Sequence, residues 1–579
     1  MSTRGKSYDL STVANRMRGP QLSVSFRALI YARGRKLHKL VHLRAALLAL
    51  STLSVPAAAR VVVVNANGYT LDGSKIVRFG TLVIGDDGRV EATAATAPPA
   101  RTGDTVIDAK GRTLLPGLID AHGHVMSLGF KALAVELSDT TSLDAALAKL
   151  AAYAAANPDA AWIVGSGWNQ ERWGLGRFPT AAELDRAVTR PTYLERVDGH
   201  AGWANTAALK AAKIDAATVA PAGGSIERLP GGAPAGVLVD AAKGLVQRIL
   251  PKPTPKQAMA ALDKAMAILS SVGLTQVADM GVDADVWKLY RKYDAANRLT
   301  VRIAGYAGGM DNLAKIARAP VRWAGSGRLA MNGVKLYGDG ALGSRGAWLK
   351  ADYADAPGQR GLRFNTDAVL RANVVKAGAQ GFDLAVHAIG DAADAQALDA
   401  LAAAPKGVMR RIEHAQIVDP ADLPRFAALG VVASMQPTHA TSDKGMAEAR
   451  VGEARLAGGY AWATLLKSGA ALAGGSDFPV EPPHPFYGWH AAVTRQDRSG
   501  LPAGGWRKAE ALTREQAFAA FTTGAATANR SERGTGTLTP GKWADFILVD
   551  ADPFKVPEGD LWKIGVEETW LAGKRVFAK

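Results

Sequence analysis

The sequence contains no cysteine. Disulfide bonds, thiolate metal sites and a lipid anchor on an N-terminal cysteine are therefore excluded. It also lacks an apolar run of the roughly 20 residues that a membrane-spanning helix requires. What the 579 residues do have is 48% hydrophobic and 21% charged content, with no internal repeat, which is ordinary for a large globular enzyme.

The first 59 residues hold much of the excess positive charge. They contain ten Lys and Arg against one acid, Asp9, while the whole chain has a net charge of +16. A basic stretch, an apolar run from Ala45 to Val55 and small residues up to Ala59 follow one another, which is typical of a secretory signal. The pattern predicts a leader over residues 1–59, cleavage near Ala59 and a periplasmic or secreted protein without a stable membrane anchor. The alternative is a disordered tail followed by a buried helix.

Because the positive charge is concentrated in the leader, we do not expect the protein to bind nucleic acid.

Both ends of the remaining chain have the pattern of β-hairpins. In residues 60–115, β-branched runs alternate with Asn-Gly, Asp-Gly and Lys-Gly turns, and residues 530–579 repeat that style. Neither segment has enough strands to close a core by itself. We therefore expect one small β-sandwich built from both termini.

Residues 116–529 alternate strand-like and Ala-rich helical runs. This alternation predicts an α/β fold of the (β/α)8 barrel type. The expected strands are 117–125, 274–281, 299–309, 332–341, 382–391, 410–418, 431–440 and 471–480. The gap after the first strand is far longer than one crossover helix needs, so it predicts an inserted subdomain over about 160–251.

Ligand-type side chains fall near the carboxyl ends of five of these strands. His122 and His124 are two residues apart, which places both imidazoles on one face of an extended strand. The other members of the set are Lys335, His387, His414 and Asp477. Barrel active sites are built at this end of the strands, so the six side chains are predicted to converge on a metal site.

This set resembles the amidohydrolase superfamily. The motifs at 167–173, 198–209, 335–349, 387–391, 411–416, 435–439 and 475–481 are similar to those of its YtcJ-like branch, which includes N-substituted formamide deformylases. The resemblance covers essentially all of residues 60–579. It implies a metal-dependent hydrolase that cleaves a carbon–nitrogen bond, other than a peptide bond, in a small-molecule amide.

The resemblance also implies two divalent metal ions, usually Zn2+, and a role for each ligand. His122, His124 and Asp477 would hold one ion, His387 and His414 the other, and a carbamate on Lys335 would bridge them. An unmodified ammonium cannot ligate a cation, whereas imidazole and carboxylate suit Zn2+. A metal-bridged hydroxide would attack the substrate, and Asp477 would act as general base and then general acid.

Other side chains are candidates for binding the substrate. His200, Tyr337 and His439 could bind or polarise its carbonyl group, or could instead make loop hydrogen bonds or packing contacts. Trp168 could line a pocket under the insertion, or could belong to the core of the insertion.

Two alternatives to amide cleavage are a deaminase or an ester or lactone hydrolase on the same scaffold, and a metal-free binding protein. A homo-oligomer is compatible with the sequence.

Overall fold

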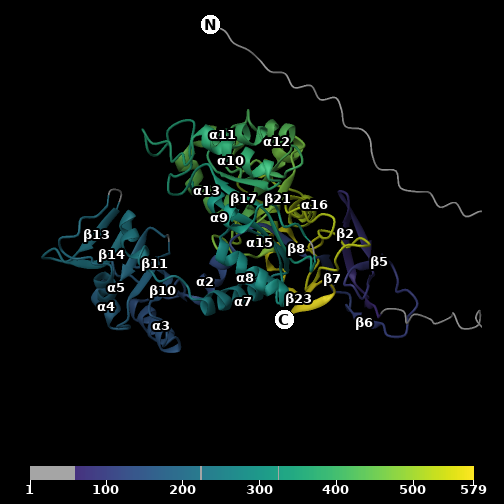
Figure 1. Cartoon of the computed structure of the whole chain (residues 1–579), viewed down its shortest axis with the longest axis horizontal. Helices are drawn as coiled ribbons and strands as arrows, with labels where there is room; N and C mark the ends of the chain where they lie inside the picture. Colours follow the sequence, from purple (N-terminus) through teal and green to yellow (C-terminus); the bar gives the residue numbers. More distant parts are fainter. Residues whose placement is uncertain (1–58, 198, 222–223, 324) are drawn as a thin grey trace, which may run out of the picture. The chain divides into compact units, whose positions relative to one another are not determined.

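The computed structural model describes residues 59–197, 199–221, 224–323 and 325–579 (Figure 1). The predicted leader, apart from its last residue Ala59, therefore lies outside the described residues. Within these ranges, every helix is too short or too polar to cross a membrane.

The centre of the fold is an eight-stranded parallel sheet in the order β21-β20-β19-β18-β17-β16-β15-β8, which forms the barrel. All eight strands predicted from the sequence are present, and the predicted fold class is confirmed. Their bounds are β8 (Leu118–Gly123), β15 (Leu274–Val282), β16 (Arg302–Gly308), β17 (Leu329–Tyr337), β18 (Asp383–Ala388), β19 (Arg410–His414), β20 (Val431–Met435) and β21 (Leu472–Gly474).

Helices connect and cover these strands, as a parallel sheet requires. α7 shows how the sequence starts one: Thr254 and Gln257 form a reciprocal capping box, and Pro255 takes the first helical position, where its missing N–H is not needed. The barrel helices are α2 (Val125–Leu133), α7 (Pro255–Ser271), α8 (Ala284–Ala295), α9 (Gly309–Ile316), α10 (Asp367–Ala379), α11 (Asp391–Ala402), α12 (Leu423–Leu429), α13 (Pro437–Val451), α14 (Trp462–Lys467), α15 (Pro485–Thr494), α16 (Arg514–Ala519) and α17 (Ala525–Ala528).

The seam between the first and last strands, β8 and β21, closes the barrel. Past the end of β21, Gly123 and Phe478 form a parallel bridge. The backbone N–H of Asp477 donates to the His122 carbonyl at 2.7 Å, and that of His124 donates to the Phe478 carbonyl at 2.8 Å. Asp120 reinforces the seam, because its carboxylate accepts from the Ser476 hydroxyl at 2.6 Å. The chain segments that carry the predicted ligands are thus joined directly.

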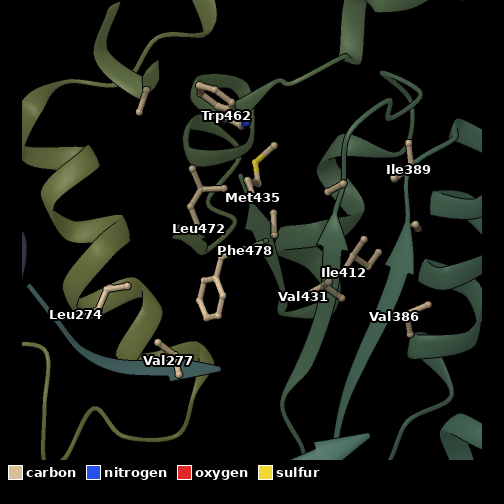
Figure 2. Close-up of a cluster of buried hydrophobic side chains, with 14 of the residues drawn as sticks. Leu274, Val277, Val386, Ile389, Ile412, Val431, Met435, Trp462, Leu472 and Phe478 are labelled. Carbon is tan, nitrogen blue, oxygen red and sulfur yellow. The ribbon is translucent and has the colours of Figure 1, made fainter. Parts of the chain in front are cut away.

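The largest hydrophobic core lies between the barrel strands and their helices. Figure 2 shows part of it, where Val386, Ile412 and Val431 come from three neighbouring strands and Trp462 and Phe478 come from segments that pack on them. These side chains are almost completely buried. Burial of an aliphatic side chain of this size contributes about 1.5–3 kcal/mol, so the core holds the strand ends in place.

Two further sheets contain strands from both ends of the described chain. Their orders are β5-β4-β1-β6 and β24-β23-β22-β7-β2-β3. Late strand β22 pairs antiparallel with early strand β7, and the two sheets share a core that includes Leu82, Leu114 and Phe546. The strands are β1 (Val61–Val64), β2 (Asn67–Asp72), β3 (Lys75–Phe79), β4 (Thr81–Ile84), β5 (Val90–Ala94), β6 (Thr105–Asp108), β7 (Thr113–Pro116), β22 (Phe546–Val549), β23 (Val566–Leu571) and β24 (Lys574–Ala578).

A buried ion pair joins this sandwich to the barrel. Arg302 of β16 donates to both carboxylate oxygens of Asp545, at 2.6 and 2.8 Å, and both side chains are almost fully buried. Such a pair costs desolvation but is strongly destabilising to break, so it fixes the position of the sandwich against the barrel.

The insertion forms a mixed sheet in the order β13-β14-β12-β11-β10-β9, with its own cores around Trp168 and Tyr193. It starts earlier than the predicted residue 160, because β9 and α3 already pack within it. Its elements are β9 (Val135–Glu136), α3 (Leu143–Ala156), β10 (Ile163–Trp168), α4 (Ala181–Asp185), β11 (Thr192–Arg196), β12 (Ala201–Ala204), α5 (Thr206–Ala211), β13 (Gly224–Arg228), β14 (Pro234–Asp240) and α6 (Gly244–Gln247).

Candidate metal centre

The two histidines of the H-x-H motif end β8 and face Asp477. Nε2 of His124 lies 3.1 Å from Asp477 Oδ1, and Nε2 of His122 lies 3.4 Å from the same oxygen. A Cβ on Gly123 would meet the Phe478 ring at 2.1 Å, so only glycine fits between the histidines. The packing of Phe478 therefore places the loop after β21 against the end of β8.

His414 and Asp477 both have left-handed backbone conformations, with φ of 79° and 58°. Such values cost a non-glycine residue of order 1–3 kcal/mol and persist only where the surroundings enforce them. Glu413 already points into the barrel, and in a regular strand the next side chain would point away. The left-handed backbone at His414 turns its imidazole toward the centre as well. Ligand-type atoms of His122, His414 and Asp477 all lie within 4.8 Å of one another.

Lys335 and His387 complete the group. The Lys335 ammonium lies 3.4 Å from His122 Nε2, and its side chain is 1% exposed. The His387 ring packs edge-on against the His414 ring, with centroids 4.5 Å apart. The structure thus brings all six predicted ligands to the carboxyl end of the barrel.

The donor atoms fit a metal ion. Among the described residues, His387 Nε2 and Asp477 Oδ1 are buried atoms without a hydrogen-bond partner. Buried polar atoms are rarely left in this state, and imidazole nitrogens with carboxylate oxygens are a ligand set that suits Zn2+. The unsatisfied atoms are therefore accounted for if they hold a divalent cation.

Burial sets the protonation of these groups. It lowers the pKa of Lys335 to about 8 and, together with the nearby lysine charge, the pKa of His387 to about 3. Burial also holds the pKa of His414 well below its ordinary value. For Asp477, burial would raise the pKa, but the surrounding histidines outweigh it and keep the pKa well below its usual range. His387 and His414 are thus neutral and Asp477 is an anion, the forms in which these groups ligate metals.

Comparison with known proteins agrees with this geometry. Residues 105–577 match the model of the amidohydrolase family. The chain belongs to the amidohydrolase family.

Relatives of this amidohydrolase cover most of its length. It is 32% identical to YtcJ of Bacillus subtilis, a protein named as an amidohydrolase, over 82% of this chain and 90% of YtcJ. It is 28% identical to an N-substituted formamide deformylase of Arthrobacter pascens, over 88% of this chain and 97% of that enzyme. The crystal structure of a metal-dependent hydrolase from Pyrococcus horikoshii matches with a TM-score of 0.72 and 28% identity, over 86% of this chain and 99% of that one. The protein is therefore a metal-dependent hydrolase.

The candidate substrate-binding residues of this amidohydrolase divide into two groups. The Tyr337 ring lies 5.4 Å from the Lys335 ammonium, and the His439 ring stacks on that of His414 with centroids 6.0 Å apart. Both therefore border the centre. His439 Nε2 is buried and has no hydrogen-bond partner in the described part of the chain.

The other two candidates belong to the insertion. Trp168 is fully buried, and its indole N–H donates to the Leu194 carbonyl at 2.8 Å. Of the two roles considered for Trp168, the structure shows packing in the core of the insertion. His200 lies at the surface, with Nδ1 2.8 Å from Asp240 Oδ1, so it is grouped with the insertion rather than with the metal ligands.

A buried ion pair next to His122, formed by Glu413 and Arg411, was not predicted from the sequence. Nδ1 of His122 lies 2.6 Å from Glu413 Oε2, and the Arg411 guanidinium donates a hydrogen bond to the Glu413 carboxylate at 2.8 Å. Burial would raise the pKa of Glu413, but Arg411 and His122 outweigh it and hold the pKa below its ordinary value. The Glu413 carboxylate accepts a hydrogen bond from the Nδ1–H of His122. The other ring nitrogen, Nε2, is then unprotonated and can ligate a metal ion. The sequence signal for this pair is that Arg411 and Glu413 are charged residues at alternate positions of a buried strand.

Asp339 and Gln436 are two further residues that the sequence reasoning did not identify. The Asp339 carboxylate accepts the backbone N–H groups of Trp348, Ile389 and Gly390, and it lies 3.5 Å from His387 Nε2. Burial raises the pKa of Asp339 to about 7. Gln436 Oε1 lies 2.8 Å from His414 Nδ1. The Gln436 contact orients the His414 ring, and Asp339 lies beside the His387 ring.

Proposed function

We propose that this amidohydrolase hydrolyses a carbon–nitrogen bond, other than a peptide bond, in a small-molecule amide. The observation that carries the proposal is the convergence of His122, His414 and Asp477 at the carboxyl end of the barrel. The similarity to an enzyme named for N-substituted formamides, along almost its full length, favours an amide over an ester or lactone.

The residues of the centre would hold two divalent ions, for which we propose Zn2+. His122, His124 and Asp477 would hold one and His387 and His414 the other, with Lys335 between them as a carbamate. Support for the carbamate is that Lys335 is buried and, in the described ranges, has no carboxylate within 4.0 Å. A charged ammonium left in this position would repel a metal ion. When bound, the ions would supply a Lewis acid and lower the pKa of an adjacent water.

The side chains then have distinct tasks in amide cleavage. Asp477 would accept the proton of the attacking water and return it to the leaving nitrogen. His439 Nε2 would donate a hydrogen bond to the substrate carbonyl oxygen as negative charge develops on it. Glu413 would keep His122 in the tautomer that ligates.

The proposal is tested with Asp477→Asn and with a screen of N-formyl, N-acyl and cyclic amides together with esters and lactones. Loss of a general acid and base should lower kcat by about a hundred to ten-thousand-fold with a smaller change in KM. Asp419→Asn is the control, because Asp419 binds Lys350 near the surface and should be dispensable. Cleavage of esters alone, or a kcat for Asp477→Asn within about threefold of the unaltered protein, would contradict the proposal.

A further inference from the structure

Two neighbouring barrel strands, β15 and β16, carry none of the six predicted metal ligands. They lie between β8 and β17, both of which carry ligands. At their carboxyl ends they have glycine instead: Gly281 on β15, and Gly308 on β16 followed by Gly309 at the start of α9. On this side the metal centre is therefore bordered by backbone without side chains.

Gly308 is at a position that faces the metal centre. It pairs in parallel register with Lys335, and residues that pair in this way point to the same face of a sheet. Lys335 points inward, since its ammonium lies 3.4 Å from His122 Nε2. Tyr306, on the same face of β16 as Gly308, also points inward, because its hydroxyl accepts from the Arg411 guanidinium at 3.3 Å. At Gly308 the corresponding inward side chain is missing.

The space next to these three glycines is open. Apart from its chain neighbours, a Cβ on Gly309 would have no atom within 4 Å, and a Cβ on Gly281 would have only His124 Nδ1, at 3.9 Å. For Gly308 the nearest atoms would be those of the Gly281 backbone, from 3.2 Å. Gly281 is a bulged residue of β15 with φ of 130°, and bulges are common next to active sites. We call Gly281, Gly308 and Gly309 the glycine edge of the centre.

Aromatic side chains follow the glycine edge on the next strand, β17. Tyr337 is the next inward residue after Lys335; its ring lies 5.4 Å from the Lys335 ammonium, and the side chain is 38% exposed. The segment around Phe364, which is 51% exposed, is bound to the end of this strand. The Phe364 N–H donates to the Gly338 carbonyl, and the Asn365 side chain donates to the Tyr337 carbonyl, both at 2.9 Å. Large apolar side chains exposed together beside a site indicate a ligand-binding surface.

The charges that follow the glycine edge disfavour an anionic ligand. Asp283 caps α8 shortly after Gly281, and its carboxylate accepts the Val286 N–H at 2.8 Å. Asp311 lies in the first turn of α9, shortly after Gly309. Both acids are exposed, so water screens them, but a carboxylate on a ligand would still be repelled.

We propose that the glycine edge and Tyr337 bind an uncharged apolar group of the substrate, and that Gly308 and Tyr337 determine the size of that group. The inference rests on the proposed amide hydrolysis, because it concerns the same site. It narrows the substrate class to amides with an uncharged apolar substituent. Backbone without side chains leaves room for the substituent, and the Tyr337 ring supplies an apolar surface on which it packs. Amides that carry a free carboxylate are disfavoured.

The test uses three hydroxamic acids that share one metal-binding group and differ in their tails. Acetohydroxamic acid, hexanohydroxamic acid and adipic monohydroxamic acid are titrated calorimetrically into the full-length, zinc-loaded protein. Hexanohydroxamic acid should bind at least about tenfold more tightly than acetohydroxamic acid, because its longer apolar tail is buried against the edge. Adipic monohydroxamic acid has the same number of carbons but ends in a carboxylate, so it should lose most of that gain.

Gly308→Leu places a side chain where the substrate group would lie. Its affinity for hexanohydroxamic acid should fall at least about tenfold, while its zinc content and its affinity for acetohydroxamic acid stay unchanged. Gly559→Leu is the matched control, because it adds the same side chain between β22 and β23, at an exposed glycine with no atom within 4 Å of the new Cβ. If Gly308→Leu does not fold, Tyr337→Ala decides: it should reduce the advantage of hexanohydroxamic over acetohydroxamic acid without loss of zinc.

Three results would overturn the proposal: equal binding of acetohydroxamic and hexanohydroxamic acid, equal binding of the two six-carbon acids, or a full hexanohydroxamic advantage in the folded variants. Hydroxamate binding requires the metal centre but no cleavage. A protein that prefers hexanohydroxamic acid yet cleaves no amide would therefore contradict the proposed function alone. One that cleaves amides without this preference would contradict the role of the glycine edge alone.

Discussion

Neutralising Glu413 should damage the metal centre and the fold by amounts that can be measured separately. In Glu413→Gln, Arg411 loses the only charged group at hydrogen-bond distance from it within the described residues, at 2.8 and 3.2 Å, and both side chains are 0% exposed. Removing one member of such a buried pair costs about 3–5 kcal/mol of stability. His122 also loses the anion that holds its Nδ1 proton at 2.6 Å. Loss of a partner of this kind lowers metal affinity about 10–100-fold, or roughly 1.4–2.7 kcal/mol.

The assays for Glu413→Gln are urea unfolding of the metal-free protein and competitive zinc titration. Asp545→Asn is the matched control, because it breaks another buried arginine pair, with Arg302, at the boundary with the sandwich. Both variants should lose stability, but only Glu413→Gln should lose zinc affinity. If the two variants bound zinc equally, or if Glu413→Gln stayed within about threefold of the unaltered protein, the positioning role of Glu413 would be refuted.

Three further predictions concern the centre and the sandwich. Lys335→Ala should lose at least one equivalent of metal, measured by elemental analysis, and a short-chain carboxylic acid should restore part of the activity; full metal content in the variant would exclude a bridging role. Removal of residues 540–579 deletes β22 to β24 from a shared sheet, so circular dichroism should show loss of cooperative unfolding, whereas a soluble, active truncation would contradict the shared sandwich. The metal-free protein should lose stability as the pH falls below 6.5, because the pKa of His387 is about 3 when folded and the unfolded chain takes up a proton that the folded one cannot. At about 1.4 kcal/mol per pH unit the loss from this residue reaches about 3 kcal/mol at pH 4, and urea unfolding of His387→Asn should show a correspondingly smaller pH dependence.

The architecture was predictable because each barrel strand is a short apolar run bounded by turn residues. The order of such strands follows from their alternation with helices. The start of the insertion was not predictable in the same way. β9 is only two residues long, and α3 has the same Ala-rich composition as the barrel helices, so nothing in the sequence separates it from them. Only the packing of α3 in the core of the insertion distinguishes it from the barrel helices.

The centre was predictable in its ligands but not in what supports them. Lys335 and His387 stand out as polar residues at the ends of apolar strands. Glu413 is adjacent to His414, and strict alternation along a strand would send one of the two away from the centre. The left-handed backbone at His414, with φ of 79°, lets the side chains of both Glu413 and His414 reach the metal centre. Such a turn depends on the closed barrel and has no local sequence signal.

The pairing of β7 with β22 has a consequence for how the protein is made. Pro116 pairs with Phe546, so 430 residues must be synthesised before the partner of β7 exists. At about 5–20 residues per second this takes roughly 20–90 s. Throughout that time β7, whose side chains are all buried in the finished fold, is an open strand edge able to pair with other chains. A nascent chain of this topology therefore depends on being shielded from its neighbours until its last strands emerge.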